Sequence, residues 1–219
     1  FTAVSEKFNK KSEATSAIPK DKDVAVVRSV TSKEKTEKAP ALYDLTTLQR
    51  DANRQLGYTA QQTLDYVQSL YEKKLCTYPR TDSRYLTDDM ADGVNAVVAC
   101  SVGICKGSAP AVILSKQICN SKKVSDHHAI IPTMELAKAD PDALPESEKN
   151  ILTLAGARLL FATAEPHIYE AVTAVFSCAG TDFTARGKTV LAEGWKELQR
   201  RYRATLKDKP EAEDGENAD

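Results

Sequence analysis

The two ends of this 219-residue chain have the residue pattern of β-strands, whereas its middle has the pattern of helices. Val24–Val30 is a β-branched run, and the polar stretch Thr31–Lys38 after it fits either a loop or a continued strand. Tyr169–Cys178 and Phe183–Leu191 alternate loosely between apolar and polar residues. This β–α–β order suggests that both ends contribute to one β-rich domain. The sequence therefore predicts an α+β fold, with a helical domain inserted into a β-rich domain.

The domain boundaries are expected where the pattern changes. The β-rich domain is assigned residues 1–40 and 166–200, and the helical domain residues 41–165. Residues 201–219 are expected to form a linker and an acidic disordered tail, because Asp208–Asp219 holds six carboxylates and one lysine. That tail carries a net charge of −5, and the whole chain carries −1, so the remaining residues carry +4. A mildly basic body permits nucleic-acid binding.

Two helices are predicted at the start of the middle region. Apolar residues recur at helical spacing from Leu45 to Leu56, and Gly57 is a suitable stop. Thr59 then begins Thr-Ala-Gln-Gln, a capping-box pattern with Gln62 at the third helical position. Two helices joined by a glycine turn make a helix-turn-helix arrangement, although a packed helical hairpin is the simpler interpretation. Further helices are expected at about residues 87–104 and 145–162.

Composition excludes several classes of protein. Apolar runs such as Ala109–Leu114 are far shorter than the stretch of about 20 residues that crosses a bilayer, so no membrane association is expected. The five cysteines are odd in number and include no Cys-x-x-Cys pair, which disfavours a disulfide framework and a structural zinc site. They fit reduced thiols in a cytosolic protein.

The first candidate for chemistry is Tyr78-Pro79-Arg80-Thr81-Asp82. Proline biases the residue before it toward an extended conformation, in which Tyr78, Arg80 and Asp82 share one face. A phenol with a pKa of about 10 is a weak nucleophile at neutral pH. A fixed guanidinium favours the phenolate and stabilises the charge on a phosphate under attack. On residue types alone, however, a packed strand tyrosine beside a surface ion pair fits the same string better.

The second candidate is Ser125–Thr133, which contains His127 and His128 shortly after Lys122-Lys123. A histidine can donate to a phosphate oxygen or relay a proton. Adjacent side chains point apart, so the two histidines make a poor metal site. In isolation the pair fits one histidine beside the core and one in solvent.

One apparent nucleotide motif is dismissed. Gly187-Lys188-Thr189 resembles the end of a phosphate-binding loop, but that motif needs a glycine at the position of Asp182. No ATP is therefore expected.

Taken together, four ordered segments resemble the type IA DNA topoisomerases, and most closely their bacterial topoisomerase III branch. The resemblance covers nearly the whole chain up to the tail, and an ordered match of four segments is far more specific than any one of them. The segments are Leu42–Leu56, Gly57–Glu72, Thr77–Leu86 and Asp126–Thr133.

The resemblance implies a function for each motif. The tyrosine that matches Tyr78 attacks a phosphodiester of single-stranded DNA, forms a 5′-phosphotyrosyl link and releases a 3′-hydroxyl, without ATP. The arginine that matches Arg80 stabilises the transition state, and the histidine that matches His127 supports it near the scissile phosphate. We expect a cytoplasmic protein that acts on the bacterial nucleoid. The expected DNA-contacting residues are Gln62, Thr81, Asp82, Ser83, Arg84, Lys122, Lys123 and His128.

The resemblance also implies an incomplete enzyme. In this family an acidic cluster in a Toprim domain binds Mg²⁺, and the sequence contains no such cluster, so the Mg²⁺ ligands are expected outside this chain. The chain begins at Phe1, without an initiator methionine, as a piece of a longer polypeptide would. Residues 41–165 are then the tyrosine-bearing domain, and the β-rich part is the hinge that lets a gate open. Alone, the piece is expected to be inactive.

Two alternatives remain at this stage. Residues 46–73 also fit a helix-turn-helix in a non-catalytic DNA-binding module, which would bind a duplex sequence without Tyr78. A tyrosine recombinase or type IB topoisomerase is disfavoured, because such sites usually set several basic residues before a late tyrosine, whereas here Tyr78 precedes His127.

Overall fold

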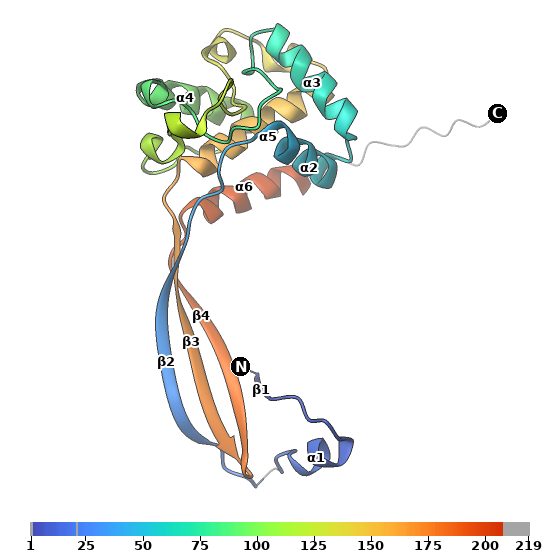
Figure 1. Ribbon diagram of the computed structural model, residues 1–219, viewed down its shortest axis with the longest axis vertical. Helices are drawn as coiled ribbons and strands as arrows, with labels where there is room; N and C mark the ends of the chain where they lie inside the picture. Colours follow the sequence, from blue (N-terminus) through green and yellow to red (C-terminus); the bar gives the residue numbers. More distant parts are fainter. Residues whose placement is uncertain (1, 21, 208–219) are drawn as a thin grey trace, which may run out of the picture. The chain divides into compact units, whose positions relative to one another are not determined.

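The computed structural model describes residues 2–20 and 22–207, and it contains two compact units (Figure 1). The sheet unit consists of Phe1–Glu37 and Pro166–Glu193. The helical unit consists of Lys38–Glu165 and Gly194–Asp219. The predicted acidic tail, 208–219, lies outside the described residues.

The sheet unit is a four-stranded antiparallel sheet with strand order β1-β4-β3-β2. Its elements are β1 (Ala3–Ser5), α1 (Lys11–Ser16), β2 (Val26–Glu37), β3 (His167–Cys178) and β4 (Thr181–Ala192). The polar stretch after Val30 continues the strand, because β2 pairs with β3 through Glu37. A two-residue turn joins β3 to β4, with Ala179 and Gly180 at φ of 49° and 77°. Two positive φ angles match the twist that such a tight hairpin requires.

The helical unit has five α-helices and a series of short 3₁₀ turns among the described residues. The helices are α2 (Leu45–Leu56), α3 (Ala60–Glu72), α4 (Val94–Cys105), α5 (Glu146–Ala162) and α6 (Trp195–Lys207). The 3₁₀ turns are η1 (Asp88–Gly93), η2 (Ser115–Ile118), η3 (Ser121–Lys123), η4 (Met134–Ala137) and η5 (Pro141–Ala143). The helix predicted at 87–104 is thus a 3₁₀ turn followed by a shorter α-helix.

The predicted caps of the first two helices are confirmed. Gly57 ends α2 with φ of 73°, a left-handed conformation that favours glycine, and its N–H donates to the Asn53 carbonyl. Thr59 and Gln62 form the capping box of α3, in which each side chain accepts from the other residue's main-chain N–H, at 3.1 and 2.9 Å. The side-chain oxygen of Gln62 is therefore used to cap the N-terminus of α3.

The core of the helical unit is built around α5, which packs against the other four helices. A buried polar cluster lies within it. Arg158 of α5 pairs with the Asp51 carboxylate, lies 4.1 Å from the Tyr43 ring centroid and donates to the Tyr43 hydroxyl at 3.0 Å. Tyr43 in turn donates to Asp51 at 2.8 Å, and its carbonyl accepts from Ile130 N at 2.8 Å. This cluster ties α2 and α5 to the segment that carries the histidine pair.

The boundary predicted near residue 200 is wrong. Strand character was expected through residue 200 and a linker from 201, but α6 forms a helix from Trp195 to Lys207 within the helical unit. Trp195 and Tyr202 are each 8% exposed, with Leu198 packed against the same core. This i, i+3, i+7 stripe anchors the helix. The dense charges between these three residues hide the stripe in the sequence.

Candidate active site

Two irregular segments of the helical unit, residues 76–86 and 118–133, lie side by side through hydrogen bonds. Thr77 is the main link, because its N–H donates to the Ile131 carbonyl and its hydroxyl donates to the Ala129 carbonyl, both at 3.0 Å. The same hydroxyl accepts from Ile131 N at 3.0 Å. The tyrosine and histidine motifs, far apart in the sequence, are thereby held together.

Two hydroxyl side chains anchor the loop after Tyr78. Thr81 Oγ1 donates to the His127 carbonyl at 2.7 Å and accepts from Ser83 N at 3.0 Å. Ser83 Oγ donates to the Lys123 carbonyl at 3.0 Å. Thr81 and Ser83 are only 9% and 4% exposed. This burial does not fit the expectation that they contact DNA, and the structure makes them positioning residues of the loop.

The Tyr78 ring lies between two other rings. Its centroid is 4.2 Å from that of His127, with an interplanar angle of 43°. On another side, Tyr71 of α3 packs edge-on at 5.3 Å. Tyr78 is half-buried and His127 is exposed. The phenol is thus held by its ring while remaining accessible, with an imidazole beside it that can donate to a phosphate or accept a proton.

Arg80 and Asp82 project from the outer side of the same loop. The chain alternates between buried Pro79, Thr81 and Ser83 and exposed Arg80 and Asp82, which is the period of extended backbone. At Arg80 the chain tightens, because Thr81 N donates to the Pro79 carbonyl at 3.0 Å. Among the described residues, no partner is found for the Arg80 guanidinium. Asp82 accepts a hydrogen bond from Ser125 Oγ at 3.1 Å. A shared face that includes Tyr78 stays a prediction.

The remaining basic candidates differ in how free their side chains are. Arg84 is half-buried and donates to the Leu42 carbonyl at 3.1 Å. Lys123 lies over the Tyr85 ring at 4.5 Å, whereas Lys122 is exposed on η3. His128 Nδ1 is 2.9 Å from the Ala129 carbonyl.

Gln62 is the one candidate on α3, and it is not brought to the site. It precedes Tyr71 by nine residues, which in an α-helix is about 13.5 Å along the axis and about half a turn around it. Tyr71 is the site residue that sequence reasoning missed. No local pattern in the sequence indicates that it packs against Tyr78.

The cysteine nearest the tyrosine is not a competing nucleophile. Burial raises the pKa of the Cys76 thiol to about 12. A thiol is nucleophilic as the thiolate, so Cys76 is inert at neutral pH.

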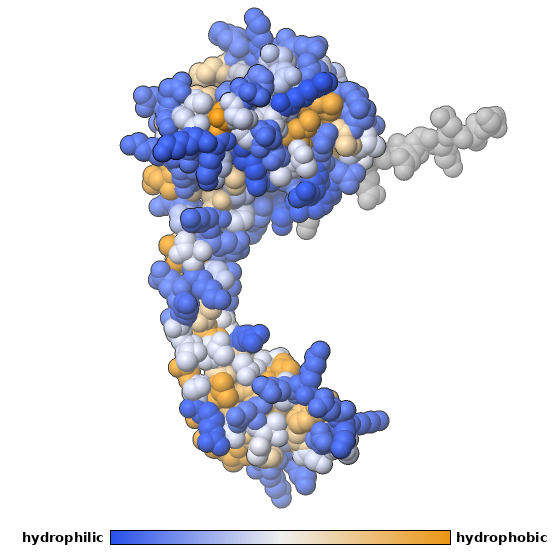
Figure 2. Space-filling view, in the orientation of Figure 1, coloured by the Kyte–Doolittle hydropathy of each residue, from blue (hydrophilic) through white to orange (hydrophobic). Residues whose placement is uncertain are grey.

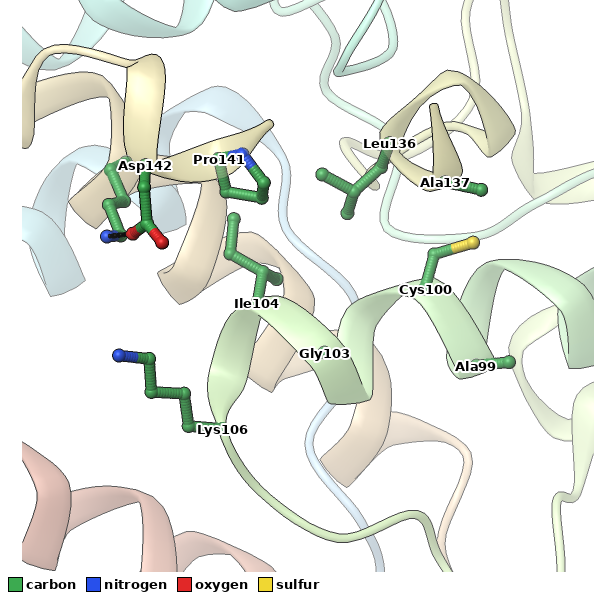
Figure 3. A pocket seen from close by; sticks show the side chains of 10 residues that line it. Ala99, Cys100, Gly103, Ile104, Lys106, Leu136, Ala137, Pro141 and Asp142 are labelled. Carbon is green, nitrogen blue, oxygen red and sulfur yellow. Dashed lines mark hydrogen bonds and ion pairs between the residues drawn. The ribbon is translucent and has the colours of Figure 1, made fainter. Parts of the chain in front are cut away.

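A separate cavity of about 470 Å³ lies between α4 and the η4–η5 segment, with Cys100 and Ile104 on one wall and Leu136 and Pro141 on the other (Figure 3). None of its lining residues belongs to the tyrosine site. Within residues 2–20 and 22–207, no cluster of three or more histidine, cysteine or acidic side chains is arranged to hold a metal ion. In the same ranges no helix is long and apolar enough to cross a membrane.

Comparison with known proteins gives consistent matches. The family model described as DNA topoisomerase matches residues 2–219. DNA topoisomerase 3 of Bacillus cereus (strain ATCC 10987) is 41% identical over 185 residues, covering 81% of this chain and 25% of the relative. DNA topoisomerase 3 of Bacillus subtilis (strain 168) is 39% identical over 179 residues, covering 78% and 24%.

A solved structure shares the fold. Full-length topoisomerase I from Thermotoga maritima matches with a TM-score of 0.63 and 21% sequence identity, over 89% of this chain and 32% of that one. The chain thus spans about a quarter of the length of the topoisomerase 3 relatives. A family match over nearly all of its residues settles the membership: this chain belongs to the type IA DNA topoisomerases and is similar to their topoisomerase III members.

Proposed function

We propose that this chain supplies the nucleophile of an enzyme that cuts and rejoins one DNA strand, and that Tyr78 is that nucleophile. The observation that carries the proposal is the packing of Tyr78 against His127 at 4.2 Å. Two motifs separated by more than 40 residues meet at one accessible phenol. Such convergence of a nucleophile and a proton-handling side chain is what phosphoryl transfer requires.

The proposed step is a reversible exchange of phosphodiester bonds. Tyr78 Oη attacks the phosphorus and loses its proton, while the bond from phosphorus to the 3′-oxygen breaks. The 3′-oxygen takes up a proton and leaves as a hydroxyl, so the 5′ phosphate stays on the tyrosine. Attack by the same hydroxyl reverses the step. Because one phosphodiester replaces another, no ATP is needed, and the intact strand of a second DNA segment passes through the break before it closes.

Arg80 and His127 are proposed to stabilise the phosphate during attack. Arg80 is exposed on the tyrosine loop, and a guanidinium fork matches the oxygens of a phosphate. His127 lies beside the phenol on the facing segment. Lys122, Lys123 and His128 lie on the same segment as His127. We propose that they contact phosphates of the DNA backbone.

The full reaction is proposed to need groups beyond this chain. The described residues offer no ligand cluster for Mg²⁺, so no step is assigned to a metal here. We propose that Mg²⁺ binds elsewhere in the longer protein. The proposed substrate is single-stranded DNA in the bacterial nucleoid. Gly187-Lys188-Thr189, dismissed above as a nucleotide motif, lies within β4 rather than in a loop before a helix.

The test is Tyr78→Phe in the full-length protein, with Tyr71→Phe as the matched control. Each variant removes one hydroxyl from the same pair of packed rings. The proteins are mixed with single-stranded oligonucleotides labelled at either end and stopped with detergent. We expect wild type and Tyr71→Phe to carry the 3′ label covalently, and Tyr78→Phe to carry none. A covalent complex that persists in Tyr78→Phe, or that carries the 5′ label, would disprove the assignment.

A further inference from the structure

The pairing register of the sheet unit sorts its charged side chains onto two faces. Residues paired across neighbouring strands share a face, and successive residues of a strand alternate. Lys33 of β2 pairs with Ala171, which pairs with Lys188 of β4. Thr31 pairs with Thr173, which pairs with Arg186.

Four cations therefore lie on one face, at Lys33, Lys35, Arg186 and Lys188. Lys35 joins this face because it pairs with Tyr169, two residues before Ala171 on β3. The side chains agree, since Lys188 Nζ lies 3.8 Å from the Tyr169 ring centroid. All four cations are exposed, and within the described residues no hydrogen bond or ion pair involves the side chains of Lys33, Lys35 or Arg186. We call these four residues the basic sheet face.

Two of the four carboxylates of β2, β3 and β4 lie on the face opposite the basic sheet face. Glu34 and Glu170 pair with each other on the opposite face, where Ser32 donates to Glu170 at 2.5 Å. On the basic side, the acidic residues are Glu37 and Asp182, which lie at the two ends of the sheet. Between them the face presents threonine, alanine and valine side chains and the Tyr169 ring beside the cations. Figure 2 shows hydrophobic residues along the strands of this unit as well as near α1, and the exposed ones include Val26, Val27 and Val30 of β2.

We propose that the basic sheet face is a second nucleic-acid contact, separate from the tyrosine loop, that binds the sugar-phosphate backbone of a DNA segment. From strand spacing and rise, the four cations occupy a patch about 10 Å wide and about 14 Å long. A duplex carries one charge per about 1.7 Å, so about eight phosphates would lie over that length. The threonine hydroxyls of the face add donors for phosphate oxygens.

The surroundings of the face favour DNA over an acidic protein as the partner. Its central row on β3 consists of Tyr169, Ala171, Thr173 and Val175, and the Tyr169 ring is covered by Lys188 Nζ at 3.8 Å. The face therefore presents cations over its largest apolar side chain rather than an open apolar pocket for a protein side chain. A flat array of cations and hydroxyls binds phosphates without reading sequence. The choice of DNA rests on the proposed function, whereas the array itself rests on the register.

The experiment compares two variants that each remove four positive charges from the sheet unit. The face variant is Lys33→Gln, Lys35→Gln, Arg186→Gln and Lys188→Gln. The control variant is Lys7→Gln, Lys11→Gln, Lys20→Gln and Lys22→Gln, all exposed and outside the paired strands. Both are made in the full 219-residue chain with Tyr78→Phe, so that cleavage contributes nothing. Binding to a 30-nucleotide single strand and to a 30-base-pair duplex is measured by fluorescence anisotropy at several salt concentrations.

We expect the face variant to lower the slope of log affinity against log salt by about 3, since each lost phosphate contact removes about 0.7–0.9. Affinity at 0.1 M salt should fall at least tenfold, and the control should change by less than one unit of slope. The duplex and single-strand arms show which form of DNA the face prefers. Equal losses in both variants, no loss in the face variant, or binding to polyglutamate in place of DNA would overturn the proposal. Any of these results leaves the covalent test of Tyr78 unaffected.

Discussion

Replacing Thr81 by valine should destabilise the helical unit and disturb the tyrosine site at once. Valine keeps the shape of the side chain but removes the hydroxyl that donates to the His127 carbonyl at 2.7 Å and accepts from Ser83 N at 3.0 Å. Both main-chain groups lose the partner that the structure shows for them. Leaving a buried polar group unpaired costs about 1–3 kcal/mol, and the His127 carbonyl regains part of that from water because His127 is exposed. The expected loss of unfolding free energy is about 2 kcal/mol.

The assay is urea unfolding of the 219-residue chain followed by circular dichroism at 222 nm, a signal that comes mainly from the helical unit. Thr153→Val is the matched control, because the Thr153 hydroxyl donates only to the Lys149 carbonyl one turn earlier in α5. Its expected cost is below about 1 kcal/mol, as such back-bonding adds little to a helix. The reasoning fails if Thr81→Val and Thr153→Val unfold at the same urea concentration.

The same substitution should also affect chemistry in the full-length protein. The Thr81 hydroxyl fixes the backbone of His127, whose ring packs on Tyr78. We expect covalent complex formation to fall at least tenfold while single-strand affinity changes less than twofold. Unchanged cleavage in a folded Thr81→Val protein would show that the loop keeps its geometry without this bond.

Three further predictions concern the rest of the helical unit. Arg158→Met removes the buried cation beside the Asp51 carboxylate, which keeps Tyr43 and Arg54 as partners, and should cost about 1.5–3 kcal/mol. Arg54→Met, at a 65% exposed partner of the same carboxylate, should cost less than about 1 kcal/mol. Equal urea midpoints would contradict this. Because burial raises the pKa of the Cys76 thiol to about 12, this thiol should resist iodoacetamide at pH 8 in the folded chain and react rapidly in urea. Mass spectrometry measures the labelling, and rapid labelling of the folded chain would refute the prediction. Gly57→Ala should destabilise by about 1 kcal/mol because φ is +73°, while Gly103→Ala, at an exposed helical position, should stabilise by about 0.5–1 kcal/mol; thermal shifts of the same sign would be the contrary outcome.

The elements best predicted from sequence are those set by local signals. The capping box at Thr59 and the stop at Gly57 need only neighbouring residues, so the boundaries of α2 and α3 were predictable. The strand through the polar residues after Val30 was not, because cross-strand pairing with β3 decides it. The helix from Trp195 to Lys207 was missed for a similar reason, since its apolar stripe has meaning only against the core that it covers.

Tyr78 and His127 were named from the sequence as candidate site residues, but their geometry was not predicted. The ordered motifs identified Tyr78 and His127, yet nothing in either string shows that their rings lie 4.2 Å apart. That contact depends on hydroxyl bonds to main-chain carbonyls, which a sequence does not display. The contact of Tyr71 with Tyr78 was not predicted, because it follows from where α3 ends. The helix-turn-helix alternative gains no support, because α2 and α3 pack as a hairpin whose buried residues face the core.

The proposed nucleophile Tyr78 lies on irregular chain, where rigidity must come from a source other than secondary structure. Pro79, Thr81 and Ser83 are buried, and their side chains either pack or bond to the facing segment. Arg80 and Asp82 stand exposed between them. Each exposed side chain is thus flanked by side chains that hold the backbone. This alternation is the same as that between the two faces of a β-strand. Alternate residues of the loop therefore serve stability and the proposed chemistry. Substitutions at Arg80 should reduce DNA cleavage without lowering the free energy of unfolding, whereas substitutions at Thr81 should lower both.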